Sequence, residues 1–413
     1  MIVSCKYLFK FFSEKVLTLG LVNFINFLTN LITISIILKI LGPAQWGKFI
    51  LIQLWPNYLS MIAQWSFNHN EVREISANRH EFIKINKIFS ESTIIQSTIS
   101  FFSIILILFL TFSNFITVNI YGLLGLILFI FGNANQFYWL INGLEKIWQV
   151  AFLQLLSKLI ILFLIIIIFK NDLDYNILLL IYGLGFFIST LISYIYIYKF
   201  LKIKFQKIIL REAYKRFTHG FLYFFGSLSG NLKNLSIPIL IAYIGDEYYV
   251  GLFSAVERLK GYIIQVSQPI TNALYPRVVF LYKENLNVAN EMKKIFYILS
   301  ILISLPFVIF INLFPDYILL KFAGSEFINL IYELRVISFL SLLTITSEFF
   351  YYQNLIAKNL RKKLLIYNLI GLIVLIISNL LFIKHYLVLG AIMSLYVVEF
   401  FNFFILFYLK EKH

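Results

Sequence analysis

Twelve apolar stretches of about 20 residues each follow one another along almost the whole chain. A helix of ~20 residues is long enough to cross the ~30 Å hydrocarbon core of a bilayer. The composition agrees, because 60% of the 413 residues are hydrophobic and only 13% are charged, which is too apolar for a soluble domain. The sequence therefore predicts an all-α integral membrane protein. The predicted spans are residues 15–40, 45–68, 88–112, 115–140, 147–169, 175–199, 215–243, 248–276, 293–314, 327–354, 363–383 and 388–409.

Lysine and arginine are divided unequally between the connections on the two sides of these spans. Of the 35 cationic residues, 25 fall in one set of alternate connections and five in the other. An excess of Lys and Arg marks cytoplasmic connections, so we expect a multi-pass chain with both termini in the cytoplasm. The net charge of +15 is explained by anionic membrane lipids beside the inner connections, and nucleic acid is not an expected partner.

The chain also resembles itself at an offset of about 204 residues. A glycine, a short polar turn, a second glycine and a phenylalanine occur at 41–49 and again at 244–253. We interpret this as a duplication, with chance similarity between short motifs as the alternative. The interpretation predicts two six-helix lobes, residues 1–200 and 201–413, related by a pseudo-two-fold axis around a central cavity. Polar faces repeat as well: they comprise Asn23, Asn26 and Asn30 in the first span and Ser227, Asn231 and Asn234 in the seventh.

Five cations lie inside spans, where a charge is costly unless it faces protein or water. They are Lys158, Lys233, Arg258, Lys260 and Arg335. Lys158, Lys233 and Arg258 lie too deep for the side chain to reach the headgroups. We therefore expect these cations to line a polar cavity, together with the asparagines of the first and seventh spans. A cationic cavity rich in amides and phenols suits an anionic, hydroxyl-rich solute.

The alternative is that these cations form buried ion pairs that hold helices together. The intramembrane acids Glu257, Glu333, Glu348 and Glu399 could supply the partners. Two amide-rich segments, 133–142 and 351–354, could bind sugars or could join neighbouring helices, and the sequence leaves both readings open. No phosphate-binding loop, catalytic triad or metal-ligand spacing occurs, so we expect neither an enzyme, a cofactor nor a metal site.

Four short motifs connect these features to a known family. They are residues 41–47 (LGPAQWG), 68–74 (NHNEVRE), 251–258 (GLFSAVER) and 269–277 (PITNALYPR). With the twelve spans, they make the chain similar to O-antigen (Wzx-type) flippases of the multidrug/oligosaccharidyl-lipid/polysaccharide (MOP) exporter superfamily. The resemblance implies a bundle of six plus six helices around a cationic cavity, in the bacterial inner membrane.

By the same resemblance, the protein would carry an undecaprenyl-diphosphate-linked oligosaccharide from the cytoplasmic to the periplasmic leaflet by alternating access. Lys233 and Arg258 would contact the diphosphate or acidic sugars, and Glu257 and Glu348 are candidates for ion coupling. A polysaccharide polymerase and chain-length proteins would be partners. The first alternative is a multidrug or organic-ion antiporter of the same superfamily, although spans one to six lack the deep acidic residues usual in multidrug members. The second is a membrane polymerase or glycosyltransferase, which would need a long catalytic outer loop.

Overall fold

The computed structural model consists of helices and their connections over the residues that it describes, 14–68, 70–168, 174–356, 358 and 361–411. Within helices, side chains are described except at 14–20, 222–223, 225–234, 272–273, 275–277, 280, 283, 361–362, 364–365 and 406–411. The helices are α2 (Glu14–Gln64), α3 (Asn70–Ala77), α4 (Phe82–Phe112), α5 (Ile120–Ala134), α6 (Tyr138–Gly143), α7 (Ile147–Ile168), α8 (Tyr175–Ile195), the π-helix η1 (Tyr196–Phe200), α9 (Leu210–Ile244), α10 (Glu247–Glu284), α11 (Leu286–Leu313), α12 (Pro315–Phe322), the 3₁₀-helix η2 (Ser325–Leu330), α13 (Ile331–Phe350), the π-helix η3 (Tyr351–Ile356) and α14 (Arg361–Glu411).

Each predicted span corresponds to a helical segment. Eight helical runs among the described residues are long and apolar enough to cross a membrane. Two of them, in α2 and α14, are broken at Gly42 and Leu387, where the backbone is not helical, so each contains two predicted spans. Helices α9 and α10, of 35 and 38 residues, contain the remaining two.

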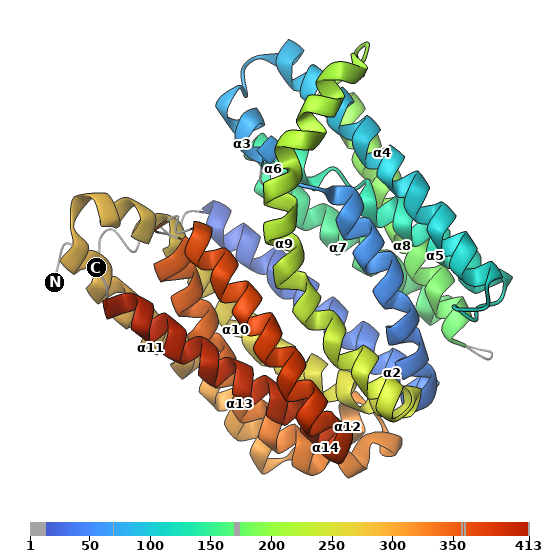
Figure 1. The fold of residues 1–413 in the computed structure, drawn as a ribbon, viewed down its shortest axis with the longest axis vertical. Coiled ribbons are helices and arrows are strands. Elements are labelled where there is room, and N and C mark those ends of the chain that lie inside the picture. The colour runs from blue at the N-terminus through green and yellow to red at the C-terminus, as the bar shows by residue number, and fades with distance from the viewer. Residues whose placement is uncertain (1–13, 69, 169–173, 357, 359–360, 412–413) are drawn as a thin grey trace. The chain divides into compact units, whose positions relative to one another are not determined.

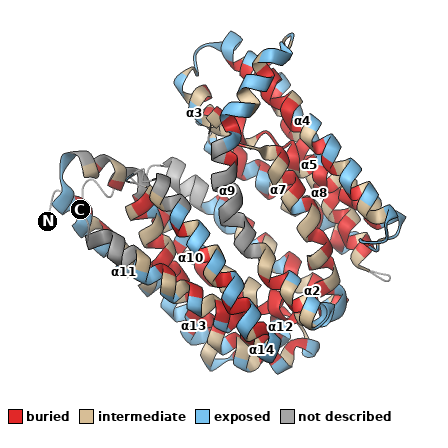
Figure 2. Ribbon diagram, in the orientation of Figure 1, coloured by how far each residue is buried: buried red, intermediate tan, exposed pale blue. Residues whose placement is uncertain are grey.

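Large apolar side chains cover the outward faces of these helices. On α4, Phe109 and Phe112 are exposed, and Phe163 is exposed on α7. Figure 2 shows buried and exposed stripes alternating around the same helices. Exposed apolar surface on this scale is unfavourable in water and favourable in lipid, which agrees with a membrane location.

The described chain divides into two compact units. Unit 1 comprises Met1–Ile34 and Ile52–Ser227, and unit 2 comprises Ser35–Leu51 and Leu228–His413. Helices α2 and α9 therefore each contribute residues to both units (Figure 1). The division into two lobes at residue 200 stays a prediction.

In unit 1, α5 and α8 lie side by side with their backbones in contact (Figure 1). A Cβ atom at Gly125 would overlap the backbone of Leu179, and one at Gly183 would overlap the carbonyl of Gly125. Small residues permit such close helix contacts in membranes. At one end of the pair, Asn119 caps α5, and the side-chain oxygen of Asn176 accepts a hydrogen bond of 3.0 Å from the Asn119 amide. The α5–α8 pair is thus a closely packed part of unit 1.

In unit 2, the two copies of the repeated glycine motif pack against each other. A Cβ atom at Gly47 would overlap the carbonyl oxygen of Glu247, and one at Gly251 would overlap the carbonyl oxygen of Pro43. Trp46, next to Gly47 in the first copy, is 0% exposed. The first copy begins at Gly42, whose φ of 66° favours glycine and breaks α2. The repeated glycines are therefore explained by close approach of two backbones.

We expect Gly47→Ala to lower the stability of the protein by ~1–3 kcal/mol, because the new methyl group meets backbone that cannot rotate away. Gly261→Ala in α10 is the matched control, since no heavy atom lies within 4 Å of its added Cβ. That control should be neutral or stabilising by up to ~1 kcal/mol, as alanine favours helix. Thermal unfolding in detergent compares the two variants, and equal midpoints would contradict the packing described here.

Candidate functional site

A polar cavity of about 490 Å³ lies within unit 1, and we name it the lysine cavity. Residues from α2, the α5–α6 segment, α7 and α8 line it: Asn30, Thr33, Gln64, Asn133, Gln136, Tyr138, Gln154, Ser157, Lys158, Ile161, Tyr182 and Phe186. Its single charged residue is Lys158, and no described Asp or Glu is part of the lining. An ammonium group in a cavity of neutral amides and hydroxyls favours an anion.

The break between α5 and α6 positions the polar groups at one wall of this cavity. α5 ends at Ala134, and Phe137 adopts a left-handed conformation with φ of 54° before α6 begins. Ser193 on α8 donates a hydrogen bond of 2.8 Å to the Gln136 carbonyl, and Gln64 donates one of 3.1 Å to the Asn133 carbonyl. Irregular backbone at membrane depth is tolerated where it is held by protein or lines a cavity.

The side chain of Gln136 is left with an unused donor by this arrangement. Gln136 is 6% exposed, and within the described structure its amide nitrogen has no hydrogen-bond partner. A buried donor without an acceptor costs free energy, which a ligand oxygen can recover. The Lys158 ammonium and the Gln136 amide together make the lysine cavity a candidate subsite for an anionic or hydroxyl-bearing group.

A second cavity, of about 380 Å³, lies within unit 2 and has the opposite charge. Three carboxylates, Glu257, Glu348 and Glu399, face it together with one ammonium, that of Lys260. We name it the carboxylate cavity. Its polar lining also includes Thr344, Ser347, Tyr351, Tyr367, Asn368 and Asn402.

Two of the remaining predicted cations, Arg258 and Arg335, have described side chains, and neither lines these two cavities. The Arg258 guanidinium is partly buried and lies 5.9 Å from the ring centre of Trp46, as in a cation–π contact. Arg335 is exposed on α13. The side chain of Lys233 lies outside the described residues, as do those of Asn231 and Asn234. The structure thus places Lys158 and Lys260 in cavities, while the roles of Lys233, Arg258 and Arg335 stay predictions.

The three asparagines of the first span have different surroundings. Asn23 is exposed, whereas Asn26 is buried and donates a hydrogen bond of 3.3 Å to the Ala151 carbonyl on α7. Asn30 lines the lysine cavity. On the predicted asparagine face of the first span, Asn26 therefore joins α2 to α7, and Asn30 lines the lysine cavity.

Several cavity residues went unnoticed in the sequence. On α7, Gln154, Ser157 and Ile161 line the lysine cavity together with the predicted Lys158. Their spacing of three, four and seven places them on one helix face, which was a usable signal. Asn402 lies three residues after Glu399 on α14, and both line the carboxylate cavity. Their spacing of three also places them on one helix face.

A buried ion network lies in unit 1 outside both cavities. Arg216 on α9 pairs with three carboxylates: Glu71 at 3.5 Å, Glu91 at 3.1 Å, and Glu74 through two hydrogen bonds. The Arg216 side chain is 12% exposed and that of Glu71 is 0% exposed. Because one guanidinium cannot neutralise three carboxylates, the burial of Glu71 dominates, and it raises the pKa of that carboxyl to about 7.

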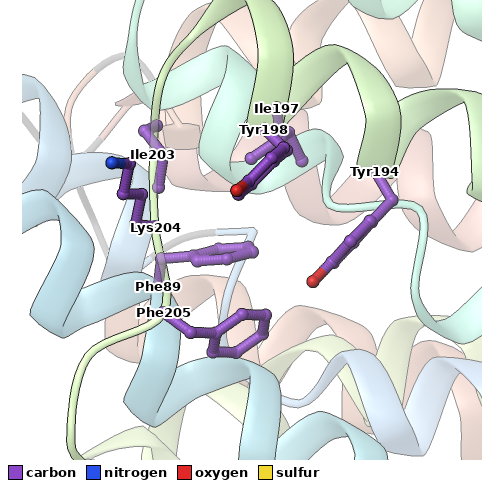
Figure 3. A pocket seen from close by; sticks show the side chains of 7 residues that line it. All are labelled: Phe89, Tyr194, Ile197, Tyr198, Ile203, Lys204 and Phe205. Atoms are coloured by element: carbon purple, nitrogen blue, oxygen red, sulfur yellow. The ribbon is translucent and has the colours of Figure 1, made fainter.

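Another cavity in unit 1, of about 270 Å³, is mainly aromatic. Figure 3 shows the rings of Phe89, Phe205, Tyr194 and Tyr198 around a common space, with the Lys204 ammonium at its edge. The Phe89 and Phe205 ring centres are 4.9 Å apart. This cavity offers few polar groups to a ligand, and we assign it no role.

The sequence profile of the family described as "Polysaccharide biosynthesis protein" matches residues 12–281, well over half of the chain. The chain belongs to this family.

Two relatives of this member of the polysaccharide biosynthesis family share the name "Putative O-antigen transporter". The one from Escherichia coli K12 is 26% identical over 360 residues, which cover 85% of each chain. The one from Shigella dysenteriae is 26% identical over 270 residues, covering 64% of this chain and 67% of the relative. The predicted family is confirmed.

Solved structures show the fold of this family member. An inward-facing multidrug resistance MATE family transporter of the MOP superfamily matches with a TM-score of 0.72 at 17% identity, covering 96% of this chain and 99% of the transporter. A MOP superfamily transporter from Pyrococcus furiosus Vc1 matches with a TM-score of 0.62, also at 17% identity, covering 96% of each chain. The predicted all-α membrane fold is therefore confirmed.

Proposed function

We propose that this protein is a flippase for a lipid-linked oligosaccharide, such as an O-antigen repeat unit carried on undecaprenyl diphosphate. The relatives named as O-antigen transporters and the polysaccharide biosynthesis family support the substrate class. The observation that carries the proposal is the lysine cavity, where the one charge among the lining residues is positive. The protein acts as a transporter and not as an enzyme.

The chemistry of the lysine cavity fits part of such a substrate. A diphosphate or an acidic sugar offers anionic oxygens to the Lys158 ammonium, and sugar hydroxyls offer acceptors to the Gln136 amide. The polyprenyl tail is as apolar as the bilayer and stays in lipid while the headgroup moves. Alternating access then exposes the headgroup site to one side of the membrane at a time.

The test replaces Lys158 in a strain that depends on this protein for surface polysaccharide. Lys158→Gln is expected to reduce transport roughly 10- to 150-fold, because a hydrogen bond to a charged group contributes ~1.5–3 kcal/mol. Lys158→Arg keeps the charge and should retain much of the activity. Surface polysaccharide on gels is the measurement, and immunoblots establish that protein levels are equal.

The exposed Lys204, at the edge of the aromatic cavity, is the matched control. Lys204→Gln removes the same charge from the same unit and should leave surface polysaccharide unchanged. Wild-type polysaccharide in the Lys158→Gln strain would refute the role of the lysine cavity.

A second candidate function is export of organic cations, as in a multidrug antiporter. The carboxylate cavity favours it, because three Glu side chains facing one Lys would attract a cationic solute. Deletion of the gene distinguishes the two candidates: greater drug susceptibility with intact polysaccharide would support the antiporter.

The proposal includes the membrane arrangement and the partners. The chain lies in the bacterial inner membrane with both termini in the cytoplasm, as the distribution of Lys and Arg indicates. Anionic lipids contact its inner connections, and a polysaccharide polymerase with its chain-length proteins receives the translocated unit. Tagging each terminus and testing its accessibility in intact cells checks the orientation.

A further inference from the structure

A further cavity of unit 1, of about 580 Å³, lies apart from the lysine cavity, and we name it the basic cavity. Its walls are α3, the connection that follows it, and the first turns of α4 and α9. Five lysine and arginine side chains line it, against three glutamates. The lining is therefore positive overall, and it belongs to the connections in which Lys and Arg are concentrated.

Ion pairs within the lining engage all three of these glutamates. Arg216 pairs with Glu74 and with Glu91, as described above. The third, Glu212, lies within ion-pair distance of two lysines of the lining. Glu71, which also pairs with Arg216, is 0% exposed and is not part of the lining. The acids of the basic cavity are thus already balanced by neighbouring cations.

Two other cations of the lining, Arg73 and Lys84, are left largely unbalanced. Arg73 on α3 is exposed and forms no ion pair among the described residues. Lys84 on α4 donates a hydrogen bond to the side-chain oxygen of Asn78 and lies 3.9 Å from Glu81, which is 64% exposed. An ion pair between two exposed side chains contributes little. Both cationic groups are therefore available to an anionic ligand.

The backbone adds to this positive charge at the start of α4. The helix begins at Phe82, and the side chain of Glu81 does not cap it. The first N–H groups of a helix and its dipole attract anions, phosphate in particular. An Arg guanidinium binds two phosphate oxygens at once, and a Lys ammonium adds a point charge. Sites for small ligands commonly measure ~300–1,000 Å³, so the basic cavity is large enough for a diphosphate.

We propose that the basic cavity binds a phosphate or diphosphate group, and that Arg73 and Lys84 hold it. A lipid headgroup and a soluble phosphorylated molecule both offer this group. In the orientation proposed above, the cavity lies among the inner connections, where it can meet either source. Such binding is separate from the lysine cavity and does not depend on the flippase function.

The first experiment measures the binding of pyrophosphate to the purified full-length protein in an uncharged detergent. The parent protein and every variant carry Lys158→Gln, so that the lysine cavity does not contribute. Equilibrium dialysis with radiolabelled pyrophosphate is expected to show saturable binding to the parent. The glutamine pair, Arg73→Gln with Lys84→Gln, should weaken the binding about 10-fold or more, because two charge-assisted contacts to phosphate are lost.

Lys207→Gln with Arg211→Gln is the matched control pair. It removes two exposed cations of the same unit that do not line the basic cavity, and it should bind pyrophosphate as the parent does. Arg73→Lys with Lys84→Arg keeps both charges and should retain most of the binding. Thermal unfolding establishes that each protein is folded, and the single glutamine variants replace the glutamine pair if it is not. Absence of saturable binding to the parent, or unchanged binding after loss of the two charges, would overturn the proposal.

A second experiment distinguishes the two sources of phosphate. The glutamine pair and the control pair are extracted from vesicles that contain phosphatidylglycerol, and native mass spectrometry counts the lipids that stay bound. Fewer bound lipids on the glutamine pair would support the site and identify a lipid headgroup as its occupant. Equal lipid counts with weakened pyrophosphate binding would support the site and identify a soluble phosphorylated molecule. Equal lipid counts with equal pyrophosphate binding would leave Arg73 and Lys84 without the proposed role.

Discussion

Arg216→Ala is expected to lower the free energy of unfolding by about 3–5 kcal/mol, the cost of removing one partner from a buried ion network. The guanidinium of Arg216 pairs with Glu71, Glu74 and Glu91. Its loss leaves Glu91 with only Lys87, at 3.7 Å, and leaves Glu71 buried without an ion-pair partner among the described residues. Thermal or denaturant unfolding in detergent measures the change.

Arg211→Ala, one and a half turns earlier on α9, is the control for that substitution. Arg211 is exposed, so its removal should alter stability by less than ~0.5 kcal/mol, as for ordinary surface changes. Arg216→Lys keeps the charge without the planar fork and should fall between the two. An Arg216→Ala variant as stable as Arg211→Ala would show that the ion network of Arg216 contributes nothing to the free energy of unfolding.

Glu71→Gln is expected to stabilise the protein above pH 7. Burial raises the pKa of Glu71 from 4.5 to about 7 in the folded chain. A raised folded pKa means that the carboxyl favours the folded state fully below pH 4.5, and that this advantage is lost as the pH rises through 7. Above that pH the ionised Glu71 costs ~3 kcal/mol relative to the unfolded chain. Glutamine fills the same space without a charge and avoids this cost.

The difference between Glu71→Gln and the native chain should therefore grow from pH 4.5 to pH 7 and then level off. Glu74→Gln is the control, and its expected effect on stability has the opposite sign. Glu74 is 35% exposed and accepts two hydrogen bonds from Arg216. Its loss should destabilise the protein at neutral pH. A pH-independent difference for Glu71→Gln would indicate that Glu71 is ionised throughout.

The spans could be predicted from the sequence because the bilayer fixes the length of an apolar helix. The break at Gly42 was also visible, as a glycine followed by Pro43 between two apolar runs. The break in α14 lies at the predicted boundary between spans 363–383 and 388–409, but its form could not be predicted. Leu387 adopts φ of 45°, and leucine carries no signal for such a conformation.

The candidate site could be predicted only in part. Lys158 stands out in the sequence because a cation inside a predicted span is rare and costly, and the structure places it in the lining of the lysine cavity. Which acids lie near which cations depends on helix packing, and spacing along one helix cannot reveal it. Arg216 illustrates this limit: its partners are 125 to 145 residues away, and in the sequence it is one of several basic residues in an inner connection.

The mutual packing of the two glycine motifs limits the substitutions that this chain can accept during evolution. Gly47 and Gly251 each face backbone of the opposite copy, so neither copy can gain a side chain there while the other keeps its present path. Under the predicted duplication, the two copies would have become tied to each other at these positions. Swapping one half for that of a distant relative would then fail at this junction unless the matching segment were exchanged with it.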